Sequence, residues 1–314
     1  MLSSAVRILF GRSTPSPAGH ASTAPLAETL PPIEVVHTSS TVPISWPAAR
    51  LALTHDLWGD GFIFPGGEPE ILRLARPLGM SSAASLLIVG AGSGGPASSV
   101  TRNFGAWITG LEHDPSLLAA AKRLTTQSKL DKKIALKPWD PDNPDFGSKC
   151  YHHCLALEPL HGAHPEPILD ALARAVRAGG QIVITALGAE LPLDLNDPTV
   201  RRWGELERRD PAHVPAPVAI TRMLARVGLD VRVAEDISDR HVEQALLGWR
   251  TMLRNLGTGT PTRPQAAQLV REAELWLLRR RLIRGGQLRM MRWHAISHPR
   301  DYEALPATNG LSTA

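Results

Sequence analysis

The chain has 314 residues, of which 43% are hydrophobic and 20% are charged, and its formal net charge is +4. This apolar content is enough for a sizeable core, so a chain that is disordered throughout is excluded. The small net charge argues against a nucleic-acid-binding protein, and no apolar stretch approaches the roughly 20 residues that a membrane-spanning helix needs.

Residues 1–45 differ in composition from the rest. Ser, Thr, Pro and Ala make up more than half of them, and the first acidic residue is Glu28. The many prolines disfavour helices and strands, which predicts a disordered leader. Arg7 and Arg12, with no acid near them, leave two interpretations open: an organellar transit peptide, which would place the protein in the mitochondrial matrix, or an uncleaved tail on a cytoplasmic protein. The second interpretation is favoured.

From residue 46 the chain alternates between helical and extended patterns. Apolar periodicity, together with glycine and proline at the element ends, predicts these elements. The expected helices are 68–79, 96–103, 115–125, 167–177 and 220–227, and the expected strands are 85–89, 106–111, 150–157, 181–185 and 229–234. Strands that alternate with helices in this way predict an α/β fold with a doubly wound, mostly parallel sheet.

The first chemical signal follows the first expected strand. Gly90, Gly92 and Gly94 lie in a strand-to-helix turn, where glycine lets the backbone approach a ligand closely. Glu112 follows at the end of the next strand, where a carboxylate can accept hydrogen bonds from both ribose hydroxyls of an adenosine group. The turn also matches the dinucleotide fingerprint through Gly95, so two cofactors are compatible with it, a nicotinamide dinucleotide and S-adenosylmethionine.

With its glycine turn, Glu112 and the Gly179-Gly180 turn before a strand, the chain resembles the class I S-adenosylmethionine-dependent methyltransferases. This resemblance favours S-adenosylmethionine as the cofactor and implies a seven-stranded Rossmann-like sheet with helical additions near both ends. It also implies that Asp140, after the third strand, contacts the adenine. The predicted organisation is one methyltransferase domain over 46–257, completed by a basic helix and closing strand over 258–298, with a disordered tail over 299–314.

Two further segments, 58–67 and 288–295, are similar to the phosphoethanolamine N-methyltransferases. That similarity implies a small-molecule acceptor, with an amine or a phosphate-bearing amine favoured. Two positions depart from the family pattern, because Ile88 stands where the first motif usually has an acid and Trp46 falls near a tyrosine position. These departures favour a second hypothesis, a catalytically degenerate S-adenosylmethionine-binding protein with a regulatory or assembly role.

An amine acceptor must lose a proton, and histidine titrates near neutral pH. His153 and His161 are therefore the candidate catalytic bases, with His55 and Glu158 as further candidates. The alternative for each histidine is an ordinary core or surface side chain.

Trp58 and Phe62 are candidates for an aromatic lid over the sulfonium or the substrate cation, and the alternative is core packing.

Arg208 and Arg281 are the candidate ligands of a substrate phosphate, because arginine forks suit phosphate and the resembled family uses basic residues in these regions. Residues 271–292 carry seven arginines and two glutamates, a local charge of +5. A solvated helix face, a protein surface or a weak contact with an anionic membrane are the alternatives for this basic helix.

Cys150, His152 and Cys154 alternate along an expected strand and so share one face. A zinc site is the alternative for this segment, but a buried strand with free cysteines is favoured, and no metal site is predicted.

Overall fold

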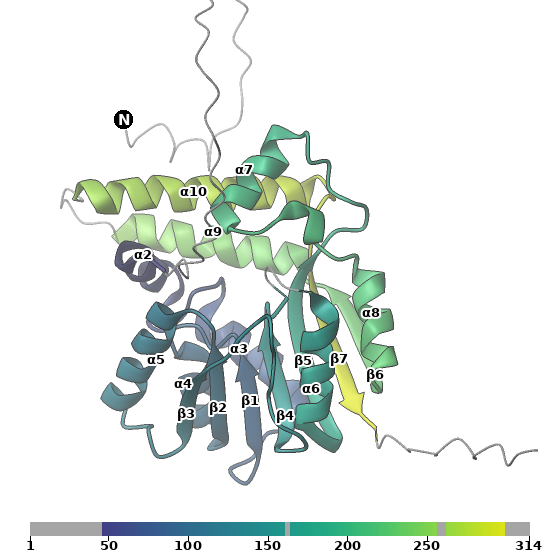
Figure 1. Cartoon of the computed structure of the whole chain (residues 1–314). Helices are drawn as coiled ribbons and strands as arrows, with labels where there is room; N and C mark the ends of the chain where they lie inside the picture. The colour runs from purple at the N-terminus through teal and green to yellow at the C-terminus, as the bar shows by residue number, and fades with distance from the viewer. Residues whose placement is uncertain (1–45, 161–163, 256–261, 299–314) are drawn as a thin grey trace, which may run out of the picture.

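The computed structural model describes residues 46–160, 164–255 and 262–298 (Figure 1). The predicted leader over 1–45, the predicted tail over 299–314 and the candidate base His161 all lie outside the described residues.

A seven-stranded sheet forms the centre of the described structure, in the order β3-β2-β1-β4-β5-β7-β6. The five strands from β3 to β5 are parallel, and β7 is antiparallel to both of its neighbours. The expected class I methyltransferase sheet is therefore confirmed. The strands are β1 (Ser85–Val89), β2 (Trp107–Glu112), β3 (Ile134–Pro138), β4 (Tyr151–Leu157), β5 (Val176–Gly188), β6 (Leu229–Asp236) and β7 (Arg289–Ser297).

Helices cover both faces of the sheet because successive strand residues point to opposite sides. Leu86 and Ile88 of β1 belong to one core cluster and Leu87 and Val89 to another, and all four are fully buried. The first core includes α3 (Gly67–Ala75) and α4 (Gly95–Phe104), and the second includes α6 (Pro165–Ala175) and α8 (Pro217–Arg226). A further helix, α5 (Pro115–Gln127), packs beside β3.

Four more helices lie over the carboxyl ends of the parallel strands (Figure 1): α2 (Ala48–Trp58), α7 (Pro198–Glu207), α9 (Ser238–Asn255) and α10 (Arg263–Arg284). We call this layer the cap. The apolar residues of the basic helix α10, such as Leu275, Trp276 and Leu282, are buried in the cap. They are thus not a free face for a membrane surface. No helix in the described residues is long and apolar enough to cross a membrane.

One element is much longer than its sequence predicts. The strand expected over 181–185 runs as β5 from Val176 to Gly188, and the helix before it ends at Ala175. The extension past Thr185 follows from the neighbouring strand, because β5 pairs with β7 from Gln181 as far as Gly188. The extension before Gln181 pairs with β4, through Val176 and Tyr151. Pairing with a distant segment of the chain cannot be read from local periodicity.

Candidate functional site

The turn between β1 and α4 has the backbone conformation that its glycines predict. Gly90, Gly92 and Gly94 have φ values of 78°, 58° and 98°, a region that L side chains rarely adopt. A Cβ on Gly90 would overlap the carbonyl oxygen of Leu157, and a Cβ on Gly94 would lie 3.0 Å from the Cα of Ala121. These two glycines are therefore required by packing. A Cβ on Gly92 would lie 3.1 Å from the Ile63 side chain, so a side chain is disfavoured there as well, although a side chain can yield more easily than backbone.

Glu112 at the end of β2 is buried directly beside this turn. Its Oε2 accepts a hydrogen bond from the Gly92 N–H at 2.8 Å, and its Oε1 accepts one from the Asp114 N–H at 3.0 Å. Burial raises the pKa of Glu112 to about 7, although the backbone donors act in the opposite direction. The Glu112 Oε1 also lies 3.3 Å from the His113 Nδ1, whereas Oε2 has one backbone donor and a second lone pair that can accept from a ligand hydroxyl.

The N-terminal part of the cap lies directly on the glycine turn. His55 of α2 places its Nε2 3.0 Å from the Ser93 hydroxyl, and the Gly95 N–H donates to the carbonyl oxygen of Gly61 at 2.8 Å. Burial lowers the pKa of His55, while a contact with Asp60 at 3.2 Å acts in the opposite direction. The segment from His55 to Gly61 thus shields the turn from water, and the imidazole of His55 lies against it.

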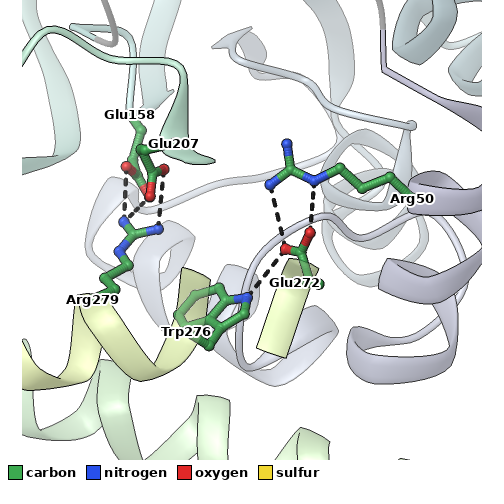
Figure 2. A network of polar contacts seen from close by, with 6 residues as sticks. All are labelled: Arg50, Glu158, Glu207, Glu272, Trp276 and Arg279. Carbon is green, nitrogen blue, oxygen red and sulfur yellow. Dashed lines mark hydrogen bonds and ion pairs between the residues drawn. The ribbon is translucent and has the colours of Figure 1, made fainter. Parts of the chain in front are cut away.

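A second group of polar side chains lies where β4 ends. Arg279 of α10 donates to both oxygens of Glu158, at 3.0 and 3.1 Å, and lies 3.6 Å from Glu207 (Figure 2). Glu158 is the first residue after β4 and has a left-handed φ of 47°. Arg209 is buried near these acids; burial lowers its pKa, and Glu158 and Glu207 counter that effect.

A separate ion pair joins α2 to α10 inside the cap. Arg50 donates to Glu272 at 2.8 and 3.3 Å, and the Trp276 Nε1–H donates to the same carboxylate at 3.3 Å (Figure 2). The Glu272 side chain is only 4% exposed. This pair holds α2, and with it His55, in place over the turn.

The prediction for His153 does not fit the structure. Its Nδ1 accepts a hydrogen bond from the Gln181 N–H at 3.2 Å, and it pairs in register with Leu86 near the start of β1. The glycine turn follows the other end of β1. His153 therefore lies away from this turn because three further residues of the strand separate it from the Leu157 end of β4.

Trp58 and Phe62 are core residues and not a lid. Both are buried, at 7% and 6% exposure. The Trp58 ring lies edge-on to Trp276 with centroids 5.4 Å apart, and Phe62 lies against Phe64 at 6.2 Å. Burial in the core leaves neither ring free to close over a ligand.

Asp140 is exposed and accepts a hydrogen bond from the Asp142 N–H at 3.0 Å, which is a turn-forming role. The ring of the preceding residue, Trp139, lies 6.0 Å from the ring of His113, the residue next to Glu112. Trp139, and not only Asp140, is therefore a neighbour of the residue that follows Glu112. The role of Asp140 toward a ligand stays a prediction.

Arg208 and Arg281 are not brought together. The pKa of Arg208 is lowered by burial and by the nearby Arg50 and Arg271, which shows that three arginines gather there. Arg281 instead lies near Asp197 at another part of the cap. Their roles as ligands of a substrate phosphate stay predictions.

The cysteine-rich strand is part of the sheet. Cys154 is fully buried, which raises the pKa of its thiol, whereas Cys150 is exposed. The His152 Nδ1 lies 2.8 Å from the Ser85 hydroxyl. Within the described ranges no three His, Cys, Asp or Glu side chains are arranged to hold a metal ion.

Arg209 and Arg279, which lie with Glu158 and Glu207 at the end of β4, are not among the residues predicted from the sequence. Arg279 carried a signal, because it lies three residues after Trp276 and three before Leu282 on the apolar side of a helix, where a charge is unusual. Arg209 carried none that local pattern could show, since it lies in a loop after α7.

Comparison with known proteins agrees with this geometry. Residues 87–184 match the family model described as "Methyltransferase domain". The chain is 27% identical over 195 residues to sterol 24-C-methyltransferase of Eremothecium gossypii, covering 58% of this chain and 52% of that protein. It is 25% identical over 134 residues to phosphoethanolamine N-methyltransferase 2 of Caenorhabditis elegans, covering 42% of this chain and 30% of that protein. The chain thus spans about half or less of these relatives.

Solved structures show the same fold. Phosphoethanolamine N-methyltransferase 2 of Haemonchus contortus, in complex with phosphomonomethylethanolamine and S-adenosylhomocysteine, superposes with a TM-score of 0.70 at 18% identity, covering 79% of this chain and 57% of that chain. Geranyl diphosphate C-methyltransferase of Streptomyces coelicolor A3(2) superposes with a TM-score of 0.56 at 14% identity, covering 72% and 76%. At these identities the likeness is one of fold.

Proposed function

We propose that this chain, which carries a class I S-adenosylmethionine-dependent methyltransferase domain, transfers a methyl group to a small-molecule acceptor, with an amine or a phosphate-bearing amine favoured. The observation that carries the proposal is the glycine turn with the buried Glu112 beside it. A turn of this kind after the first strand, with an acid after the second, suits an adenosyl ligand.

The residues at the turn fit the cofactor. Gly92 presents backbone without a side chain, and the Oε2 of Glu112 keeps acceptor capacity for a ribose hydroxyl. S-adenosylmethionine supplies a methyl group activated by a sulfonium. The chain's own contribution is to align the acceptor with that methyl group and to exclude water. The acceptor's lone pair forms the new bond to carbon, and the sulfur keeps the electrons of the bond that breaks.

Two features of the cap support an amine with an anionic group. His55 lies at the turn with a lowered pKa, so it is neutral at pH 7 and can take up the proton that a methylated amine releases. Arg208 lies near Arg50 and Arg271, and since the adjacent acids are Glu272 and Asp114, this region keeps one excess positive charge that attracts anionic acceptors.

Calorimetric titration with S-adenosylhomocysteine tests the cofactor assignment. We expect Glu112→Ala to weaken binding by about 10- to 100-fold, because a buried carboxylate that accepts from ligand hydroxyls is lost. Gly92→Arg should abolish binding by filling the cradle. Glu166→Ala is the matched control, since Glu166 is exposed and pairs with the exposed Arg226. Equal affinity in Glu112→Ala and Glu166→Ala would contradict the assignment.

One observation favours a second candidate, a cofactor-binding protein without catalysis. Ile88 replaces the usual acid of the first motif and is fully buried in the core. In that case S-adenosylhomocysteine binds normally, but incubation with labelled S-adenosylmethionine and a metabolite extract yields no methylated product. Methylated product that Gly92→Arg fails to form would instead support the enzyme.

A further inference from the structure

Histidine side chains join neighbouring strands near the start of β4, away from the glycine turn. His153 lies in β4 and His294 lies in β7, on the other side of β5. Gln181 of β5 lies between them. Its backbone N–H donates to the Nδ1 of His153 at 3.2 Å, and its side-chain Oε1 lies 2.7 Å from the Nε2 of His294. One residue of β5 thus contacts an imidazole on each side.

The contact with His153 lies where the pairing of β4 with β5 is irregular. Tyr151 pairs with Val176, but His153 pairs with Gln181, so two steps along β4 correspond to five along β5. From this pair onward the register is regular as far as Leu157. The hydrogen bond from Gln181 to the imidazole is therefore at the first pair of the regular ladder, where a strand pair opens most easily.

This hydrogen bond needs a neutral imidazole. A neutral ring has one N–H and one accepting nitrogen, whereas both nitrogens of an imidazolium are donors. The partner of Nδ1 is a backbone N–H, which can only donate, so Nδ1 of His153 must be the accepting nitrogen. A proton on Nδ1 would place two N–H groups against each other, and the hydrogen bond to Gln181 would be lost.

His294 differs from His153 in this respect. Its Nε2 faces the Oε1 of Gln181, which only accepts, so Nε2 donates in the neutral ring and in the imidazolium alike. Burial and Arg292 lower the pKa of His294, but its contact survives protonation. Acid therefore removes the contact on the β4 side of Gln181 and preserves the contact on the β7 side.

The surroundings of His153 disfavour an imidazolium. Among the described residues, burial and the adjacent His152, whose ring centroid is 6.4 Å away, lower the pKa of His153. From β5, Arg177 places its Nη1 3.1 Å from the His152 Nε2, and from β1 the uncharged Ser85 hydroxyl lies 2.8 Å from the His152 Nδ1. The short helix η1 (Arg76–Leu78) contacts β5 and carries the exposed Arg76. These neighbours are basic or uncharged, so none of them stabilises a protonated His153.

We propose that His153 is an acid-sensitive link between β4 and β5. Its neutral ring holds the first pair of the ladder closed, and a proton on Nδ1 opens that pair while the ladder toward Leu157 and the glycine turn stays formed. The pKa of His153 is lowered in the closed state, below the ordinary value of 6.5, so opening takes up a proton. Opening is therefore independent of pH above about 6.5 and is favoured as the pH falls below it. This property does not depend on the proposed methyl transfer.

Amide hydrogen exchange of the full chain, followed by NMR and corrected for intrinsic exchange rates, measures the opening at Gln181. We expect its protection to fall at least about fivefold from pH 7 to pH 5, and up to about 30-fold if the closed ring stays neutral at pH 5. The Val183 amide, further along β5, should change less than about twofold over the same range. Equal protection of Gln181 at both pH values, or an equal loss at Gln181 and Val183, would overturn the inference.

Variants assign the pH dependence to one ring. His153→Asn places an amide oxygen near the position of Nδ1, which accepts at every pH, so the protection of Gln181 should no longer change between pH 5 and 7. His153→Phe leaves the N–H without this acceptor, so protection should be low at both pH values; should this variant not fold, the comparison with His153→Asn decides. His294→Asn is the matched control, because it removes the imidazole on the other side of Gln181 and should keep the pH dependence. A pH dependence that persists in His153→Asn, or that His294→Asn abolishes, would show that another group is responsible.

Discussion

Glu112 shows how one side chain can serve both the fold and the ligand. It ties β2 to the glycine turn through Gly92 and to the start of α5 through Asp114. Asp114 in turn caps α5 by accepting hydrogen bonds from the Ser116 and Leu117 N–H groups. The acid is thus held rigidly before any ligand arrives, which lowers the cost of ordering the site on binding.

The raised pKa of Glu112 predicts a dependence of stability on pH. Its pKa is about 7 in the folded state and 4.5 as the reference for the unfolded state, so between these values the folded state binds the proton more strongly. The free energy of unfolding should therefore fall as pH rises from about 4.5 to 7, by up to about 3 kcal/mol from this group. Urea denaturation at several pH values measures it.

Burial also lowers the pKa of several histidines, so the comparison with Glu112→Gln is needed to isolate the contribution of the glutamate. The variant removes the titration but leaves a buried backbone N–H facing the amide, which costs about 1–3 kcal/mol at every pH. We expect the difference in unfolding free energy between wild type and variant to shrink as pH rises. A difference that is constant from pH 5 to 8 would show that Glu112 does not titrate there.

At the scale of elements, local pattern predicted the central strands well. The strand expected over 85–89 has those bounds, and α4, α5 and β4 lie within a few residues of prediction. Glycine at the ends of these elements and runs of apolar residues within them were sufficient to predict their bounds. The cap was harder, because α10 buries two charged residues, Arg279 and Glu272, that a pattern of apolar residues does not place.

The Arg50–Glu272 pair predicts a measurable coupling between α2 and α10. Arg50→Met should cost about 3 kcal/mol in unfolding free energy, because it leaves the Glu272 carboxylate buried without its cation. Glu272→Leu added to Arg50→Met should recover most of that loss, since both charges are then gone. Chemical denaturation of the two single variants and the double variant measures the coupling.

A pair in the same layer provides the control. Arg202 donates to Glu274 at 2.7 and 2.8 Å and also joins α7 to α10, but both side chains are exposed, at 46% and 39%. Arg202→Met should therefore cost less than about 1 kcal/mol. Losses of equal size at Arg50 and Arg202 would show that burial is not what gives the first pair its strength.

The sequence predicted the part of the candidate site that is formed by neighbouring segments of the chain. The glycine turn and Glu112 could be placed from the sequence, because strand ends and spacing fix them. The charged residues at the end of β4 could not be placed in this way, since Glu158, Arg209 and Arg279 come from three segments that only the folded cap brings together. The same reason explains the outcome for His153. The strand that contains it was predicted correctly, but the residue pairs with Leu86 near the start of β1, away from the glycine turn.

For the molecule as a whole, the last strand completes the sheet. β7 lies between β5 and β6 and pairs with both, so β6 is attached to the sheet only through β7 among the described strands. Trp293 of β7 is fully buried, and its Nε1–H donates to the Thr221 hydroxyl of α8 at 2.9 Å. The C-terminal strand thus joins the sheet and one of its covering helices.

A chain that ends at Leu288 should consequently fail to fold cooperatively. It would expose the edge of β5 along Gln181 to Gly188 and leave β6 without a paired neighbour. We expect loss of the sigmoidal thermal transition in circular dichroism and loss of S-adenosylhomocysteine binding. A chain that ends at His298 retains every described element and is the control. Trp293→Ala is a milder version, expected to cost about 3–5 kcal/mol through the cavity it leaves while the strand still pairs. If the chain ending at Leu288 melts like the control, the closing strand is dispensable and the sheet is held by its parallel strands alone.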